Sequence, residues 1–223
     1  MENDISLIAL LSLASLAPFL IACGTSYIKF SIVFVMVRNA IGLQQIPSNI
    51  TLNGVAFVLS MFVMMPVMKE GYNHFKHQPI DLSSAETIEA WIDSGFADYK
   101  RYLQKYSDPE LARFFEQAQR ARDGELPDEE ETPPPSLFAL LPAYALTEIK
   151  DAFKIGFYIY LPFVVIDLLI SSILLCLGMM MMSPVTISVP IKLLLFVVMD
   201  GWTLISKGLL EQYLDISGAG TVY

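Results

Sequence analysis

The chain has 223 residues and a formal net charge of −9, with 54% hydrophobic and 17% charged residues. A soluble domain of average composition carries roughly 25% charged residues. Here the apolar residues also come in long runs rather than in an amphipathic rhythm. These features exclude an ordinary soluble globular domain and predict an integral membrane protein.

The first predicted element is an uncharged apolar run of 19 residues from Ile5 to Cys23. This length suffices for a helix to cross a hydrocarbon core of roughly 30 Å. The run follows an acidic start, whereas a secretory signal peptide starts with basic residues, so we expect it to be retained. The next stretch, Tyr27 to Val37, is too short to cross alone, and Lys29 and Arg38 add charge to it.

Three further apolar runs follow. Ile50 to Met68, with 19 residues, predicts a second span. Ile155 to Met182, with 28 residues, and Val185 to Ser206, with 22, predict a helical hairpin that turns at Ser183-Pro184. Basic residues resist transfer across a membrane, so the basic segment 24–49 is expected on the cytoplasmic side. The N-terminus, the acidic region and the C-terminus would then face the periplasm.

The polar region 69–135 holds 15 acidic and 8 basic residues, a net charge of −7. Tyrosines and Leu103 at helical spacing predict one helix around residues 99–106. Ser107-Asp108-Pro109-Glu110 predicts the start of another, with Ser107 and Glu110 at capping-box spacing. The acidic, proline-rich segment 123–135 is typical of a solvated linker.

From Ser136 the chain becomes amphipathic, and a predicted helical face carries Leu137, Leu141, Ala145, Ile149 and Phe153. The predicted fold class is therefore all-α: an integral membrane protein of apolar helical hairpins with a polar, partly helical periplasmic insertion. The predicted divisions are N-terminal hydrophobic helices (1–68), the acidic periplasmic helical region and linker (69–135), an amphipathic helix plus the C-terminal hydrophobic hairpin (136–217), and a flexible tail (218–223).

Charged residues inside apolar segments are the first candidates for a functional site, because an unpaired ion there is costly. Asp167 and Lys192 lie at similar distances from the methionines at the hairpin turn, so folding would bring them to similar depth. A structural ion pair, an intersubunit contact and a proton or ion relay are the open interpretations. Asp167 with Asp200 is not typical of an intramembrane aspartyl protease, because neither aspartate is flanked as such enzymes require.

Other sequence patterns predict no catalysis. His74 and His77 are spaced as metal ligands can be, but no cysteine lies nearby, and a solvated segment is the simpler interpretation. Phosphate-binding loops, serine elbows and dinucleotide fingerprints are missing from the sequence. The sequence therefore predicts a protein that is not an enzyme and needs no cofactor or metal.

The run Gly178-Met179-Met180-Met181-Met182-Ser183-Pro184 is unusual. Four successive methionines cannot serve one helix face, because consecutive residues point about 100° apart. They could pack against lipid or the protein core. Alternatively, flexible thioether side chains could fill an irregular orifice and yield to varied passengers.

Four stretches of this sequence carry a resemblance to a known family. They are MENDISLIALLSLASLAPFL, TSYIKFSIVFVMVRNAIGLQQIPSNITLNGVAFVLSMFVMMPV, LLPAYALTEIKDAFKIGFYIYLPFVVIDL and GMMMMSPVTISVPIKLLLFVVMDGW. On these stretches the chain resembles the SctR/FliP family of export-gate proteins of type III secretion systems. The acidic start favours the virulence branch over the flagellar branch. Only residues from about 78 to 132 carry little of the resemblance.

The resemblance implies a non-enzymatic subunit of the bacterial inner membrane that assembles around a secretion pore. The expected partners are further copies of the chain, typically five in all, together with SctS-, SctT- and SctU-like export-apparatus proteins, membrane lipid and secreted proteins in transit, but no nucleic acid. In that family the hairpins stack into an assembly lifted largely out of the bilayer plane.

The resemblance also implies roles for particular residues. The family's methionine gasket matches Met179, Met180 and Met181, and Met182 is an additional methionine. The family's charged contacts match Lys29, Glu148, Asp167 and Lys192. We therefore expect a gate whose methionine loops close a protein-conducting channel. A small-solute or proton transporter that uses Asp167, Lys192 and Asp200, and a purely structural membrane scaffold, are the alternatives.

Overall fold

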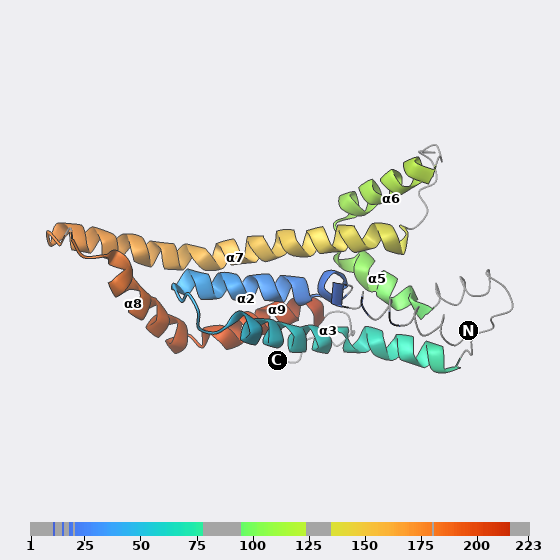
Figure 1. Ribbon diagram of the computed structural model, residues 1–223, viewed down its shortest axis with the longest axis horizontal. Coiled ribbons are helices and arrows are strands. Elements are labelled where there is room, and N and C mark those ends of the chain that lie inside the picture. The colour runs from blue at the N-terminus through green and yellow to red at the C-terminus, as the bar shows by residue number, and fades with distance from the viewer. Residues whose placement is uncertain are drawn as a thin grey trace. The chain divides into compact units, whose positions relative to one another are not determined.

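The computed structural model describes residues 21–77, 95–123, 135–179 and 181–214, together with Leu11, Ser15, Pro18 and Phe19. The helices with assigned bounds are α2 (Tyr27–Ile41), α3 (Asn49–His77), α5 (Ala97–Tyr106), α6 (Pro109–Asp123), α7 (Leu137–Cys176), α8 (Pro184–Val198) and α9 (Gly201–Leu214) (Figure 1). The predicted all-α fold class is confirmed. Most of the predicted first span, most of the acidic linker and the predicted tail lie outside the described residues.

Two described helices are long and apolar enough to cross a membrane. They are Asn49–Asn73 within α3 and the whole of α7. Helices α8 and α9 meet the same criteria only as a pair, and this pair is bent by 60° at the break between them. The described residues therefore contain two or three candidate spans, consistent with the predicted membrane protein.

Among the described residues, the chain divides into two compact units. The first unit comprises residues up to Ile28 and Met64–Ile149. The second unit comprises Lys29–Val63 and Lys150–Tyr223. The methionine run and most of the charges within apolar segments belong to the second unit.

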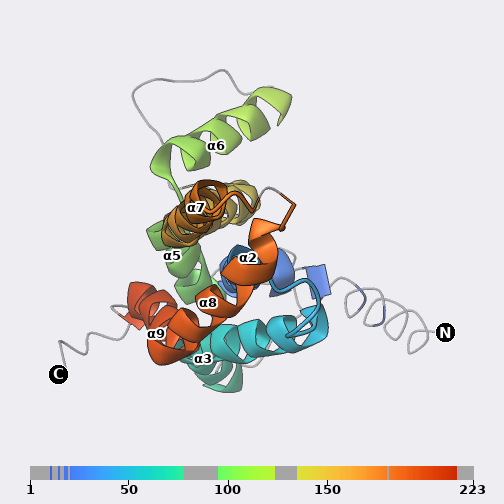
Figure 2. The ribbon, with the colours of Figure 1, turned by 90° about the vertical axis from the view of Figure 1, so that its left-hand side faces the viewer.

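Helix α2 is the central helix of the second unit, and Figure 2 shows it among α3, α7, α8 and α9. The rings of Phe30 and Tyr213 meet edge to face at 5.7 Å, which packs α2 against α9. Ser31 donates a hydrogen bond to Asn53 of α3 at 2.8 Å. Because neighbours surround it, α2 is buried at Phe30, Val33, Phe34, Val37, Ala40 and Ile41. Its apolar sequence thus builds a core rather than a span.

Small residues let α2 approach its other neighbours. A Cβ atom at Gly156 of α7 would overlap the side chain of Met36. Helix α2 ends at Ile41 and is followed by Gly42, whose φ of +94° lies in the left-handed region. There Gly42 N–H donates to Asn39 O and Leu43 N–H to Arg38 O, the pair of bonds that defines a Schellman cap. Glycine is favoured at this position because side chains strain that backbone.

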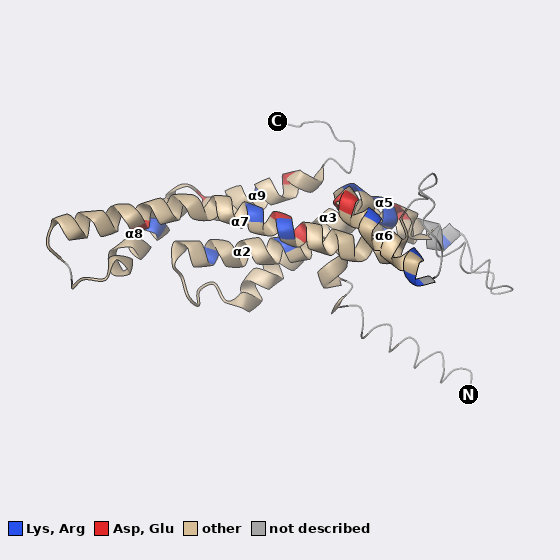
Figure 3. Ribbon diagram, turned by 90° about the horizontal axis from the view of Figure 1, so that it is seen from above, with Lys and Arg blue, Asp and Glu red and all other residues tan. Residues whose placement is uncertain are grey.

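The first unit holds the polar helices α5 and α6 and the beginning of α7. Figure 3 shows Lys, Arg, Asp and Glu gathered on α5 and α6. Both predicted polar helices are confirmed, but the predicted capping box is wrong. The Ser107 hydroxyl donates to Leu103 O at the end of α5, and Asp108 accepts the Glu110 N–H in its place. Asp108 precedes Pro109 directly, which makes it the geometrically suited cap.

The predicted face of the amphipathic helix is also wrong. Phe153 is exposed, and Leu137, Leu141, Ala145 and Ile149 are only half-buried. The buried face lies about one residue away, at Leu140, Tyr144 and Glu148. The prediction grouped apolar residues, whereas the buried face includes Tyr144, whose hydroxyl contacts Tyr102 of α5, and lies beside Thr147, which accepts the Asp108 N–H.

The second arm of the predicted hairpin is not one helix. Helix α8 ends at Val198 with Met199 as its C-cap, Asp200 adopts a φ of +51°, and α9 begins at Gly201. Asp200 accepts a hydrogen bond from the Thr203 hydroxyl at 2.9 Å, which stabilises the new helix start. A Cβ atom at Gly201 would overlap the Phe196 ring, so the bend depends on a glycine there.

Candidate functional site

The methionine run forms a connector between α7 and α8. Gly178 caps α7 with a φ of +72°. Gly178 N–H donates to Leu175 O at 3.1 Å and Met179 N–H to Leu174 O at 3.0 Å, which again defines a Schellman cap. Met182 N–H donates to Met179 O at 3.2 Å and closes a turn. Backbone hydrogen bonds therefore fix where the connector begins.

The described methionines of this connector are all exposed, Met181 far more than the other two. Met181 is fully exposed, at 103% of its reference area, and Met179 and Met182 are 39% and 44% exposed. Met180, the fourth predicted gate residue, lies outside the described residues. The three described thioethers are available to contact something other than their own chain.

Lys192 and Asp167 are brought together from α8 and α7. Lys192 Nζ lies 2.5 Å from Asp167 Oδ2 and 3.4 Å from the carbonyl oxygen of Ala40. Ala40 belongs to the last turn of α2, where carbonyl groups lack helical partners and attract cations. One ammonium group thus joins α2, α7 and α8.

Lys29 is buried at the opposite end of α2. Its Nζ atom lies 3.6 Å from Asp151 Oδ2 and 4.9 Å from the centre of the Tyr213 ring. A cation over an aromatic ring is stabilised by the ring quadrupole. Sequence reasoning missed Asp151, although its place in the Lys150-Asp151 pair at the edge of an apolar run marked it as a candidate.

Arg38 is a second residue with a role that sequence reasoning missed. Its Nη1 atom donates to Pro47 O at 3.0 Å and to Asn49 Oδ1 at 2.6 Å. These bonds tie the end of α2 to the beginning of α3. In the sequence this charge indicates only orientation, whereas in the structure it also fixes the loop between the two helices.

Glu148 is buried on α7 in the first unit, with only 1% of its surface exposed. Nearby, the Tyr102 and Tyr144 hydroxyl oxygens lie 2.6 Å apart, and the backbone N–H of Asp108 donates to the Thr147 hydroxyl at 2.9 Å. Burial raises the pKa of Tyr102, an effect that its bond to Tyr144 opposes and the Glu148 charge reinforces. Glu148 therefore lies within a polar, aromatic part of the first unit.

A further aromatic residue of α5, Tyr99, joins it to the segment before α2. Tyr99 donates a hydrogen bond to Gly24 O at 2.8 Å, and its ring stacks on Tyr102 with centroids 6.4 Å apart. Burial, with a smaller contribution from Cys23, raises the pKa of Tyr99 to about 12. The hydroxyl thus stays protonated and remains a donor at physiological pH.

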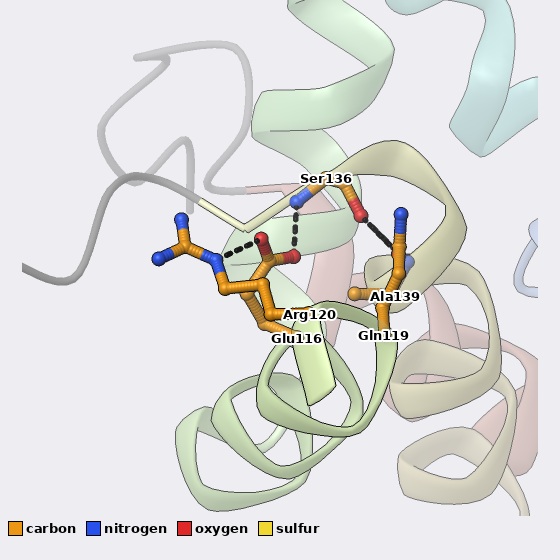
Figure 4. Close-up of polar contacts among 5 residues, drawn as sticks. All are labelled: Glu116, Gln119, Arg120, Ser136 and Ala139. Atoms are coloured by element: carbon orange, nitrogen blue, oxygen red, sulfur yellow. Dashed lines mark hydrogen bonds and ion pairs between the residues drawn. The ribbon is translucent and has the colours of Figure 1, made fainter. Parts of the chain in front are cut away.

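Helix α6 holds the first turn of α7 through Ser136 (Figure 4). Glu116 accepts the Ser136 N–H at 2.8 Å, and Gln119 accepts the Ser136 hydroxyl hydrogen bond at 2.9 Å. Arg120 pairs with Glu116 at 3.3 Å. Burial alone would raise the pKa of Glu116, but the bonds from Ser136 and the Arg120 charge together hold that pKa below its usual value.

Among the described residues, no group of three or more His, Cys, Asp and Glu side chains could hold a metal ion. Asp167 pairs with Lys192, whereas Asp200 pairs with Thr203. Because each aspartate has a different partner, the two do not form the shared-proton pair of an aspartyl protease. The side chains of His74 and His77 lie outside the described part of the structure.

The fold and these contacts define a helical integral membrane protein in which embedded charges join neighbouring helices and a methionine connector is left exposed. The chain belongs to the FliP family, whose sequence pattern it matches over residues 10–209. The family prediction is thereby confirmed. Proteins of this family are type III secretion export-apparatus components and not enzymes, and this chain is accordingly a secretion component of the inner membrane.

Relatives from virulence systems match nearly the whole chain. The sequence is 62% identical over 223 residues to the surface presentation of antigens protein SpaP of Salmonella typhimurium, covering 97% of this chain and 100% of that protein. It is 60% identical over 216 residues to SpaP of Shigella flexneri, covering 97% and 99%. It is 44% identical over 214 residues to the Yop proteins translocation protein R of Yersinia pestis, covering 96% and 98%.

Proposed function

We propose that the chain is a pore-forming subunit of the type III secretion export gate and conducts unfolded proteins across the inner membrane. Family membership supports the transport role. The observation that carries the pore assignment is the methionine connector, which extends beyond the end of a 40-residue apolar helix with its thioethers exposed. Copies from several subunits would converge there and form the resting seal.

The proposed pore is built from several copies, five by the family resemblance, together with SctS-, SctT- and SctU-like proteins. Exposed apolar side chains on α7 support this, because they need lipid or a neighbouring subunit as cover. They include Phe157, Tyr158, Leu161, Val165, Leu168, Leu169 and Ile173. The polar region 69–135 would face the periplasm in this arrangement.

Flexible thioethers suit a seal that must open for passengers of different shape. A transporter would instead need its charges free to exchange protons or ions. The contact between Lys192 and Asp167, with Ala40 as a further acceptor, favours a charge used for helix packing. The gate is therefore the better supported function.

The test replaces Met179, Met180 and Met181 with alanine in the assembled export gate and measures conductance in a planar bilayer. We expect assembly to persist and the resting leak to rise, because the change removes a plug and not a helix contact. A Met68→Ala variant, which loses an exposed methionine from α3, is the control. Normal assembly with an unchanged leak would show that the connector methionines are not the seal.

A further inference from the structure

The methionines of this chain differ widely in their access to solvent. Met181 is 103% exposed and lies outside both α7 and α8, whereas Met64 of α3 is only 6% exposed. Oxidation of methionine to its sulfoxide follows exposure of the thioether sulfur. Within one chain, Met181 is therefore an exposed thioether, and Met64 is a buried one that serves as an internal reference for oxidation.

The connector backbone does not depend on the thioethers. Its hydrogen bonds run between main-chain groups, from Met179 to Leu174 and from Met182 to Met179. Oxidation would therefore change the polarity of the side chains while leaving the groups that hold the turn intact. A polar group would be introduced just beyond the Gly178 cap, whose bonds are donated by Gly178 and Met179.

We propose that Met179, Met181 and Met182 are oxidation sites through which peroxide-type oxidants open the resting seal, an inference that rests on the proposed function. Hydrogen peroxide transfers one oxygen atom to the thioether sulfur: the O–O bond breaks, an S–O bond forms, and the other oxygen leaves as water. The sulfur loses two electrons and the peroxide gains them. The product side chain is polar and chiral.

The consequence for a pore follows from hydration. A constriction lined by apolar side chains stays closed to ions because water leaves it. Sulfoxides accept hydrogen bonds and retain water, so an oxidised ring conducts ions without any movement of the helices. Two reductases, one for each sulfoxide epimer, restore the thioether and would close the pore again.

The experiment uses the assembled export gate in a planar bilayer with hydrogen peroxide as the probe. Conductance is recorded before and after treatment, and peptide mass spectrometry measures the oxidised fraction at each methionine. We expect the connector methionines to oxidise before Met64. We also expect the leak to rise as the connector methionines oxidise and to fall after treatment with both methionine sulfoxide reductases.

Two variants separate oxidation from other damage. In the first, Met179, Met180, Met181 and Met182 are all changed to leucine, which keeps the seal apolar but cannot form a sulfoxide, so peroxide should not raise its leak. The second, Met181→Gln, places a polar side chain at the most exposed position and should leak without oxidant. Equal peroxide-induced leak in parent and leucine variant would overturn the inference.

Two further results would also overturn it: oxidation of Met64 as fast as the connector, or full connector oxidation with an unchanged leak. Either result can occur even if the variant with alanine at Met179, Met180 and Met181 leaks. In that case the connector methionines are still the seal, and only its control by oxidation is wrong. If the alanine variant does not leak, the seal itself is wrong. The two proposals therefore fail separately.

Discussion

Lys192 and Asp167 carry opposite charges in very different surroundings. The lysine side chain is 6% exposed and the aspartate side chain 41% exposed. A buried ion that loses its partner destabilises a protein more than one that water can still reach. The pair is therefore asymmetric, and the two single substitutions have different consequences.

We expect Asp167→Asn to destabilise the chain by up to about 3–5 kcal/mol, because it strands the buried ammonium. Lys192→Met should cost less, since it leaves a half-exposed carboxylate. Thermal unfolding in detergent measures both. Equal losses, or a larger loss for Lys192→Met, would contradict the asymmetry.

The paired charges also predict a rescue. Exchanging the two residues, Asp167→Lys with Lys192→Asp, should restore part of the assembly that either reversal alone abolishes. Yield of the purified export gate is the measurement. Should the exchange restore nothing and cross-links place the two positions apart, the pair does not hold the helices together.

At the scale of single residues, one charged contact could be predicted from the sequence, whereas others could not. Asp167 and Lys192 were paired because both lie within apolar runs at equal distances from a turn. The position of Asp151 at the edge of an apolar run marked it as a candidate, but its pairing with Lys29 could not be foreseen, because the pairing depends on how α7 lies along α2. The Arg38 contacts with Pro47 and Asn49 depend likewise on a loop path that no residue pattern fixes.

Among the elements, α2 and α7 approach each other closely at Gly156. Gly156→Val should weaken it by about 1–3 kcal/mol, because the added side chain meets Met36 in a filled space. The matched control is Gly208→Ala in α9, where a Cβ atom meets nothing within 4 Å. Glycine is unfavourable inside a helix, so the control should be neutral or stabilising. Chemical unfolding in detergent measures the stability of both variants. Equal effects would refute the close approach of α2 and α7.

The contact of α6 with Ser136 predicts a pH dependence. Because the folded state lowers the pKa of Glu116, its stabilising effect is fully present above the usual carboxyl pKa. The effect is lost as the pH falls through the lowered value. Hydrogen exchange of the first turn of α7, corrected for its intrinsic pH dependence, should show protection fading in acid.

The matched variant for this test is Glu116→Gln. Its amide oxygen can still accept from Ser136 but does not titrate in this range. Protection in this variant should be lower at neutral pH and should not change through the acid range. If both chains lose protection alike, another group controls the first turn of α7.

Element boundaries followed from the sequence better than element faces did. Apolar runs predicted helices in α3, α7 and α8, and Ser107-Asp108-Pro109-Glu110 predicted the start of α6, but α3 extends to His77 and α7 joins the amphipathic helix and the first hairpin arm into one helix. The buried face of α7 was missed because Tyr144 and Glu148 are polar, and the contact between the Tyr144 and Tyr102 hydroxyls depends on how α5 lies against α7. The break at Asp200 was missed because an aspartate with positive φ is uncommon outside such specific turns.

For the whole molecule, embedded charges and exposed apolar surface together predict self-association. We expect the chain, extracted gently with its partner proteins, to form a particle with several copies. Native mass spectrometry counts them directly. A strictly monomeric particle, even with SctS- and SctT-like proteins present, would contradict the proposed pore.

The central position of α2 also has a consequence for biosynthesis. Helix α2 leaves the ribosome early, yet Tyr213 and Trp202, which pack on Phe30 and Phe34, are among the last described residues to be made. Until they arrive, the core of the second unit is uncovered and exposed to misassembly. The core of the second unit therefore closes only when translation of the chain is nearly complete.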